Sequence, residues 1–503
     1  MAELWHIEES RCVFGFDQSM EHPKDGLTAF GPVHLKTGKQ PTDLRVGVVG
    51  TETGIRHYRS WVASLQGPIM AEGNPDPNHS MYPGFEAAFR CRWDPEPVAA
   101  RVVSAEEISM ALRHADHHQA VYRAVTIFER QIRDYLSEEE GVVDVWFVIV
   151  PEEVHELGRP KSKVAKAQRN NESERLSRGR AKFLARQPSL FASENIAADA
   201  HRYEADFRDQ LKGRLLDKGA VVQVVRETTF DPNPSQLNQA PKPRKLQTPL
   251  EIAWNLSVST FYKGGGQPWR LAGIRPGVCY VGMVYKIIDS GSACCGAQMF
   301  LDSGDGLVFR GTPGRWWNSE KREFHLDKKT ARDLMTRAVE GYRARNKEWP
   351  REIFIHGKAR FEGAEWEGFK AALPPETKLV GVRIRRASGY KLFRTDRHPV
   401  LRGTALPLSQ YRGYIWTLGF IPRLQTYPGR EVPNPLLVDI CRGEADLRTV
   451  MKDVLALTKV NFNACLYGDG LPVTLRFADR VGQVLTAIPQ DREAPPLPFK
   501  HYI

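Results

Sequence analysis

The sequence predicts an α/β fold that is divided into two α/β units. The first half of the 503-residue chain alternates short apolar runs with segments of helical periodicity. A stretch rich in Pro, Asn, Gln and Lys follows at residues 231–248, and a second block rich in strands comes after it. A chain of this length also exceeds one ordinary hydrophobic core, so two units are expected.

Strands and helices alternate in the first half. Residues 142–150 form an almost continuous apolar run, which is typical of a strand buried on both faces. A helix is expected at 104–136, where Ser104 can cap the first turn. The other expected elements are strands at 44–50 and 220–225 and helices at 54–65 and 197–218. This alternation favours a parallel, Rossmann-like sheet, and residues 1–44, rich in Gly and Pro, are expected to wrap a core rather than form one.

The second half begins with a helix at residues 249–263, which stops at three glycines. A hairpin turn is expected at 302–306, between two of the strands. The other expected elements are strands at 277–285, 297–301, 307–309, 352–356 and 378–384 and helices at 330–346 and 444–458. We therefore predict an N-terminal segment and a first domain at residues 1–248 and a second α/β domain at 249–503.

The composition indicates a basic protein of a reducing compartment. The chain carries 71 Lys and Arg against 60 Asp and Glu, a formal net charge of +11. Such an excess suggests a polyanion as partner, nucleic acid before membrane, although many folded proteins are mildly basic without one. The seven Cys form no C-x-x-C pair, so neither a zinc site nor a disulfide framework is predicted. Without an apolar leader or a membrane-length apolar stretch, a cytoplasmic protein that spans no membrane is expected.

Three segments of the sequence allow both a functional and a purely structural interpretation. Residues 159–186 hold ten Lys and Arg against two Glu, and a surface loop or an exposed helix is expected. Residues 47–54 join a strand to a helix, as nucleotide loops do, but they match neither G-x-G-x-x-G nor Walker A, so a tight turn is favoured. Residues 114–118 contain three His and one Asp, and an exposed helical stretch is favoured over a metal site.

From residue 249 onward, six short motifs occur in an order that resembles prokaryotic Argonautes. Each motif alone has low specificity, whereas six in the same order are a strong signal. The first resembles the signature at the join of the MID and PIWI domains of that family, and the second resembles the first PIWI strand. The motifs span residues 261–269, 275–282, 354–356, 433–435, 455–463 and 471–479.

The rest of the chain is similar to short Argonautes, which consist of MID and PIWI domains without N and PAZ domains. Residues 25–32, 145–153 and 498–503 carry this similarity. The resemblance implies a Rossmann-like MID domain followed by an RNase H-like PIWI domain. It is closest to short Argonautes that work with a TIR-APAZ protein, and Sir2-APAZ relatives are the alternative.

The resemblance also implies a pocket for the 5′ phosphate of a guide strand, which needs several donors and cations at one point. Arg208 and Lys212 share a helix face, Gln223 follows on the next strand, and Lys263 ends a helix. Lys212, Gln223 and Lys263 match the last three members of the family's pattern. Arg208 stands where an aromatic residue or His is expected, and its role stays open. Without the resemblance, an Arg and Lys at this spacing are more often a solvated helix face.

A metal ion at the guide phosphate is implied as well. In some relatives the last carboxylate of the chain lies beside this phosphate and helps to hold a divalent cation. Ile503 ends a Pro-rich aromatic tail here, so the resemblance implies Mg²⁺ between the Ile503 carboxylate and the phosphate. A frayed, exposed tail is the structural alternative.

The slicing site that active relatives use is expected to be inactive in this chain. Slicing needs acidic side chains that hold two Mg²⁺ ions. The first acid is expected after Val281-Gly-Met, where Val284 stands, and the second falls on Lys358. Asp479 can fill a remaining position, but one carboxylate does not hold two metal ions.

The resemblance therefore implies a chain that is not itself an enzyme. It would hold a short guide RNA, recognise a complementary single-stranded DNA, and activate a partner protein with an APAZ domain and a TIR effector, which is favoured over Sir2. The heterodimer would oligomerise on target binding and cause abortive defence against plasmids or phage. Arg383, Arg385 and Arg386 are candidates for the nucleic-acid channel, and an exposed strand edge is the equal alternative. An active guide-directed nuclease is one alternative, and a nucleotide-binding α/β enzyme that uses residues 47–54 is another.

Overall fold

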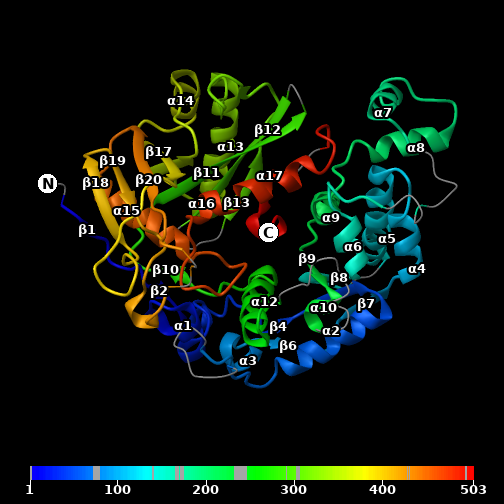
Figure 1. Ribbon diagram of the computed structural model, residues 1–503, viewed down its shortest axis with the longest axis horizontal. Coiled ribbons are helices and arrows are strands. Elements are labelled where there is room, and N and C mark those ends of the chain that lie inside the picture. The colour runs from blue at the N-terminus through cyan, green and yellow to red at the C-terminus, as the bar shows by residue number, and fades with distance from the viewer. Residues whose placement is uncertain are drawn as a thin grey trace.

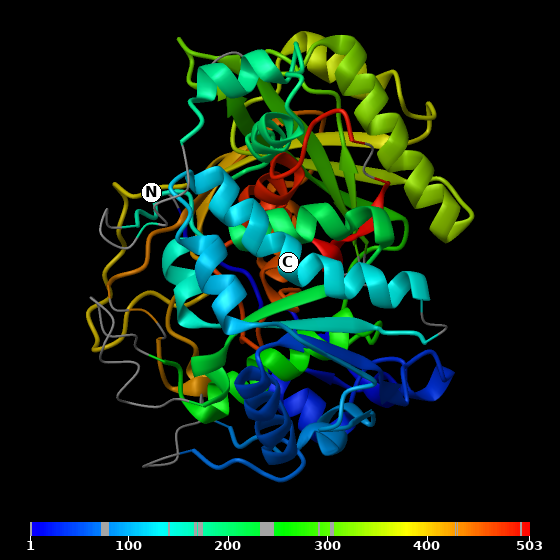
Figure 2. The same ribbon diagram turned by 90° about the vertical axis from the view of Figure 1, so that its right-hand side faces the viewer.

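The structure, a computed structural model, confirms the α/β class. It describes residues 3–71, 80–138, 141–164, 169, 175–231, 246–289, 292–301, 306–427, 429, 431–492 and 495–503. Figure 1 shows a larger sheet on the left of the view and a smaller sheet with its helices at the lower right. Helix α12 and the C-terminal end of the chain lie between them (Figures 1 and 2).

The larger sheet has ten strands, and its middle strands β11, β16 and β17 are parallel to one another. Their carboxyl ends therefore meet at one edge of the sheet, where ligands of open α/β sheets bind. The other neighbours pair in antiparallel fashion. In spatial order the strands are β1 (Trp5–His6), β18 (Thr404–Ser409), β19 (Arg412–Ile415), β20 (Leu436–Arg442), β17 (Lys378–Arg386), β16 (Glu352–Gly357), β11 (Val278–Asp289), β12 (Ser292–Phe300), β13 (Gly306–Arg310) and β21 (Leu497–Pro498).

The smaller sheet has four strands that are all parallel. Their spatial order is β7 (Ala99–Val102), β5 (Val46–Gly50), β8 (Val145–Val150) and β9 (Val222–Arg226). Every residue of β5 and β8 is buried, as the apolar run at 142–150 predicted. Short strands form three further sheets, which are β10 (Arg270–Leu271) with β2 (Cys12–Val13) and β3 (Ser19–Met20), β14 (Trp317–Asn318) with β15 (Glu323–Phe324), and β4 (Asp43–Leu44) with β6 (Arg92–Trp93).

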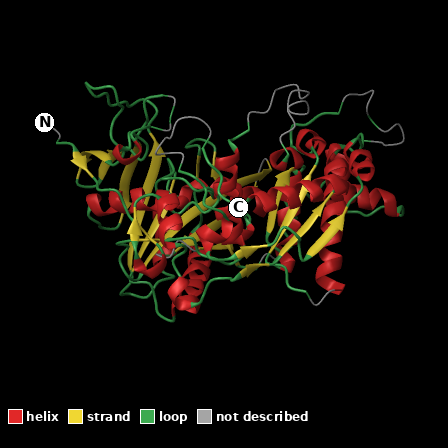
Figure 3. Ribbon diagram, turned by 90° about the horizontal axis from the view of Figure 1, so that it is seen from below, coloured by secondary structure: helices red, strands yellow, loops and turns green. Residues whose placement is uncertain are grey.

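Helices cover both sheets, and Figure 3 shows them between and around the two groups of strands. Their lengths range from single turns to the 22 residues of α5. They are α1 (Pro23–Phe30), α2 (Glu52–Ser64), α3 (Phe85–Phe89), α4 (Ala105–Leu112), α5 (His117–Glu138), α6 (Glu152–Leu157), α7 (Arg178–Leu184), α8 (Ala192–Ala200), α9 (Phe207–Leu215), α10 (Glu227–Phe230), α12 (Pro249–Lys263), α13 (Lys328–Asn346), α14 (Gly363–Lys370), α15 (Leu447–Ala456), α16 (Val473–Arg476) and α17 (Ala478–Thr486).

Side chains that alternate along the strands divide the interior into three cores. Tyr280 and Val284 of β11 face a central core with α12, α15 and α17, whereas Val281 faces an outer core with α13 and α14. The central core continues without a break to one face of the smaller sheet, and α4, α5 and α9 cover the other face. Trp254 of α12 is fully buried in this central core, a placement that contributes about 1.5–3 kcal/mol for a large apolar side chain. The shared core holds the two sheets in a fixed relation.

Two of the expected helices are each broken into two. The helix expected at 104–136 is α4 and α5, because Asp116 accepts a hydrogen bond from the backbone N–H of Gln119 and caps a new start. The helix expected at 197–218 is α8 and α9, since Asp206 caps α9 in the same way at 3.0 Å from the Asp209 nitrogen. Asp has a strong preference for caps over helix interiors.

The N-terminal residues do more than wrap a core. Phe14 and Leu27 are fully buried in the central core, and β1 is an edge strand of the larger sheet. The basic stretch at 159–186 does include an exposed helix, α7. The hairpin turn at 302–306 and most of the linker at 231–248 lie outside the described residues.

Candidate nucleic-acid interface

A pocket of about 570 Å³ lies where α9, β9 and α17 meet, at the boundary between the two halves of the chain. Arg208 of α9 and Gln223 of β9 line it. Lys212 and Lys263 lie buried beside Gln223, with 3% and 1% of their surfaces exposed. The structure therefore brings all four predicted phosphate-binding residues to one place.

The ends of two helices position the lysines. The Asp206 cap starts α9 so that Arg208 and Lys212 are one turn apart. Thr248 and Glu251 form a capping box at the start of α12, and Lys263 is its last residue. The chain then turns sharply through Gly265, whose φ of +96° lies in the region that only glycine adopts without strain.

Lys263 and Gln223 form a direct contact. The Lys263 Nζ donates to Gln223 Oε1 at 2.5 Å and lies 3.4 Å from the Val222 carbonyl oxygen. Because Oε1 of Gln223 accepts this bond, the Nε2 amide group is the part of Gln223 that can donate to a ligand in the pocket.

The two lysines form a buried pair of like charges. Burial lowers the pKa of Lys212 well below its usual range, and the nearby cations Lys263 and Arg208 lower it further. Burial and the neighbouring arginines lower the pKa of Lys263 in the same direction. Among the described residues, no Asp or Glu forms an ion pair with either ammonium group. An anion that entered this pocket would supply the missing countercharge.

Two arginines stand at the mouth of the pocket. Arg208 is half-buried, and one of its guanidinium nitrogens lies 3.2 Å from Asp209 Oδ1. Burial and the nearby Asp206 raise the pKa of Asp209 to about 6, so this carboxyl is partly neutral near that pH. Arg480 of α17 lines the same pocket, and Arg208 is one of the cations that lower its pKa. Sequence reasoning missed Arg480.

The end of the described chain also reaches the lysines. The Lys212 Nζ donates to the main-chain oxygen of buried Ile503. Lys212 contacts this oxygen, and the charges of Lys263, Arg208 and Arg480 act on Lys212, so the groups present suit Mg²⁺ only in company with the negative charge of a phosphate. The ion at Ile503 stays a prediction.

The predicted slicing positions also lie close together. Gly282 of β11 pairs with His356 of β16, and two residues further along these parallel strands stand Val284 and Lys358. Val284 is buried beneath α17, where a Cβ on Gly482 would lie 3.4 Å from its Cγ1. Asp479 is in the first turn of the same helix.

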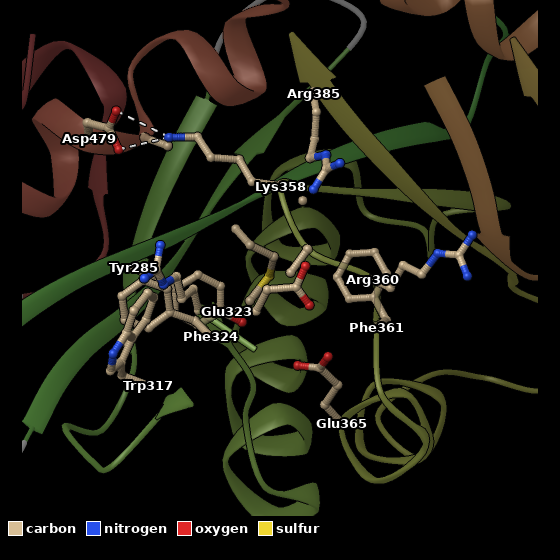
Figure 4. Close-up of a pocket in the computed structure, with 15 residues that line it drawn as sticks. Tyr285, Trp317, Glu323, Phe324, Lys358, Arg360, Phe361, Glu365, Arg385 and Asp479 are labelled. Carbon is tan, nitrogen blue, oxygen red and sulfur yellow. Dashed lines mark hydrogen bonds and ion pairs between the residues drawn. The ribbon is translucent and has the colours of Figure 1, made fainter. Parts of the chain in front are cut away.

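An ion pair occupies this place. The Lys358 Nζ lies 3.1 and 3.2 Å from the two carboxylate oxygens of Asp479 (Figure 4). Both side chains are largely exposed and line a second pocket of about 330 Å³. At this distance the lysine neutralises the one carboxylate that the sequence offered for metal binding.

The three arginines proposed for a channel have different surroundings. Arg383 is largely buried, and its guanidinium group lies 3.0 Å from Asp439. Arg360 and Arg412 pair with the same carboxylate, so Arg383 belongs to a structural cluster of ion pairs and is not free to line a channel. Arg385 is exposed and lines the second pocket, and Arg386 is exposed as well.

Three solved structures with a similar fold are Argonautes. The structure of Clostridium butyricum Argonaute bound to a guide DNA and a 19-mer target DNA matches with a TM-score of 0.63 and 13% identity. It covers 100% of this chain and 55% of that one. The chain shares the Argonaute fold.

Two structures of A. aeolicus Argonaute match as well. One, with externally bound siRNA, has a TM-score of 0.53 and 13% identity, and the match covers 100% of this chain and 56% of the A. aeolicus chain. The other has a TM-score of 0.52 and 13% identity, and the match covers 99% of this chain and 55% of the A. aeolicus chain. This chain thus spans about half the length of these Argonautes. The sequence matches no family model and no curated protein sequence.

Two segments outside these pockets have structural roles in this Argonaute fold. At the turn of residues 47–54, Thr51 caps α2 by accepting from the Gly54 nitrogen at 3.0 Å, as a tight turn requires. The expected exposure of residues 114–118 is wrong, since His114 and Asp116 are buried and Asp116 lies 2.9 Å from His201. Asp116 is held inside by His201 and by the backbone nitrogens of Gln119 and Leu176.

The described residues offer neither a further metal cluster nor a membrane-spanning helix. They contain no group of three or more His, Cys, Asp or Glu side chains that could hold a metal ion. None of the helices in the described part of the chain is long and apolar enough to cross a membrane.

Proposed function

We propose that this chain is a guide-binding short Argonaute, with a Rossmann-like MID domain and an RNase H-like PIWI domain. It holds a short guide strand by its 5′ phosphate and uses the guide to recognise a complementary strand. One observation carries the proposal: Lys212 and Lys263 are buried near Gln223 and Arg208, and among the described residues no Asp or Glu pairs with either, although Lys212 donates to the Ile503 oxygen. A phosphate that carries up to two negative charges fits this surplus of buried positive charge.

Guide and target are proposed to be RNA and single-stranded DNA, respectively. The C. butyricum structure holds a guide DNA and a target DNA, and one A. aeolicus structure has siRNA bound externally. The choice of an RNA guide rests on the resemblance to short Argonautes. Mg²⁺ at Ile503 would neutralise part of the phosphate charge when it is bound.

The second part of the proposal is that this chain does not cleave its target. The side chain of Val284 has no oxygen atom that could bind a metal ion, and Lys358 places an ammonium group where a metal ion would lie. Two Mg²⁺ ions need several carboxylates, and Asp479 is already paired. We therefore assign catalysis to a partner protein with an APAZ domain and a TIR effector. Pairing of the guide with its target would activate this partner in the cytoplasm and cause abortive defence.

The test is to express the chain alone and with its genomic neighbour, and to sequence the nucleic acid that co-purifies. Short 5′-phosphorylated RNAs are expected, and they should be lost when Lys212 and Gln223 are replaced by Ala. The pair of proteins should consume NAD⁺ when a matched DNA is added and not when a scrambled DNA is added. Absence of bound nucleic acid in both preparations, with no binding of added guides, would contradict the proposal.

A further inference from the structure

The pocket beside Lys358 and Asp479 has features that slicing does not need. It has a volume of about 330 Å³, within the range of small-ligand sites. It lies next to the carboxyl ends of the parallel strands β16 and β17, the edge at which α/β sheets bind ligands. Tyr285, Phe324 and Trp317 lie together on one side of it, and Lys358 and Arg385 lie together on another (Figure 4).

The aromatic side consists of three rings. Phe324 of β15 stacks on Tyr285 of β11, with ring centroids 5.1 Å apart and an angle of 6° between the planes. Trp317 of β14 lies 4.7 Å from the Phe324 ring and is 41% exposed. An exposed indole at the mouth of a pocket is a surface on which a nucleobase can stack.

Two arginines that line the pocket carry positive charge without an ion-pair partner among the described residues. Arg385 and Arg322 are exposed, and among the described residues no carboxylate forms an ion pair with either of them. Arg385 lies near Lys358 in the close-up, whereas Arg360 points away toward the cluster around Asp439 (Figure 4).

Three carboxylates also face this pocket. Asp479 is paired with Lys358. Buried Glu365 accepts hydrogen bonds from the backbone nitrogens of Leu326 and Glu362, at 3.1 and 2.8 Å, so its role is structural. Glu323 remains, with one oxygen 3.5 Å from His325 Nε2. A carboxylate in this place can accept a hydrogen bond from the exocyclic amino group of a base.

We propose that this pocket binds one unpaired nucleotide of the target strand, with its base against Trp317 and Phe324 and its phosphate between Lys358 and Arg385. The inference rests on the proposed function, because it assumes that a target strand passes the former slicing site. The pocket then anchors the strand that an active relative would cut, and bases with an exocyclic amino group are preferred over thymine and uracil.

The experiment is a scan of the ligand and requires no change to the protein. The full chain is loaded with a guide RNA, and its affinity for labelled target DNA is measured by fluorescence anisotropy. Single abasic sites, and separately single methylphosphonates, are placed at each target position that the guide leaves unpaired, because an abasic site at a paired position weakens binding through the lost base pair. One position, or two neighbouring ones, should weaken binding by roughly 5- to 100-fold, the range that one stacked base contributes.

Protein variants assign the sensitive position to the pocket. Trp317→Ala should remove the effect of the abasic site, and Arg385→Ala should remove the effect of the methylphosphonate. Arg386→Ala is the matched control, since neighbouring residues of a strand point to opposite faces. It should leave both effects in place.

Three other outcomes would overturn the inference in distinct ways. A flat scan with intact guide-dependent binding would refute the pocket and leave the proposed function standing. A flat scan together with micromolar binding of free adenosine monophosphate, lost in Trp317→Ala, would assign the pocket to a free nucleotide instead. Failure of the wild-type chain to bind guide or target would refute both proposals.

Discussion

Lys212 and Lys263 bury their ammonium groups close enough for the charge of Lys263 to act on Lys212, although they lie on different helices in different halves of the chain. Burial lowers the pKa of each lysine, and the nearby charge of Lys263 lowers the pKa of Lys212 further. Buried charges without a countercharge reduce the stability of a folded protein. The pair is therefore a cost to the free protein that a bound phosphate can offset.

Replacing Lys212 by Met should stabilise the free protein and abolish guide binding. The substitution keeps the length of the side chain and removes the buried charge, which is expected to increase the free energy of unfolding by about 1–4 kcal/mol. Thermal denaturation and guide affinity would be measured on the same preparation. Lys218→Met, at an exposed position close in sequence, should change neither. A lower melting temperature for Lys212→Met would show that the ammonium group stabilises the fold instead.

Guide binding should be linked to proton uptake. The pKa values of Lys212 and Lys263 are lowered in the free protein, and a phosphate raises them by favouring the charged form. Between the lowered and the raised pKa the complex holds more protons than the free protein, so the affinity falls as the pH rises through this window. Calorimetry at pH 8, where the phosphate is fully ionised, in two buffers of different ionisation enthalpy measures this uptake. Identical heats in the two buffers would contradict it.

The wild-type chain should leave a matched target intact in Mg²⁺ or Mn²⁺, because Lys358 neutralises Asp479 and Val284 offers no ligand. Lys358→Asp removes that cation and adds a carboxylate, so the variant should bind Mn²⁺ more tightly than the wild type, as measured by electron paramagnetic resonance. Lys370→Asp on the exposed side of α14 serves as control. Target cleavage by the wild-type chain would sink the assignment of an inactive slicing site.

Gly282→Ala should destabilise the contact between β11 and α16. An added Cβ would lie 2.0 Å from the Thr474 carbonyl oxygen, so the helix must move away from the sheet. Overpacking of this kind lowers the free energy of unfolding by about 1–3 kcal/mol. At Gly363 an added Cβ meets no atom within 4 Å, and Gly363→Ala should be nearly neutral. Equal melting temperatures for the two variants would show that α16 adjusts without loss.

The parts of the fold that depend on local pattern could be predicted from the sequence. The apolar run that becomes β8 predicted a strand buried on both faces, and the end of α12 at three glycines placed Lys263 correctly. The order of the strands could not be predicted. β1 and β21 have two residues each and join the larger sheet from opposite ends of the sequence, and so short a segment carries no periodicity.

The candidate site shows the same division. Lys212, Gln223 and Lys263 each lie in an element whose position the sequence indicates. Arg480 does not, because its place in the pocket depends on how α17 docks against the rest of the fold. Its neighbour Asp479 pairs with Lys358 in the other pocket, since consecutive helix residues point about 100° apart. Sequence alone could not show that one helix serves both pockets.

The most direct test compares one RNA in two forms, with a 5′ phosphate and with a 5′ hydroxyl, in binding to the wild-type chain. Charge-assisted hydrogen bonds contribute about 1.5–3 kcal/mol, so the phosphate should strengthen binding by roughly 10- to 100-fold. Gln223→Ala and Lys263→Met should reduce this ratio and leave the affinity for the hydroxyl form nearly unchanged. Equal affinity of the wild-type chain for both forms would mean that the buried lysine pair does not hold a guide phosphate.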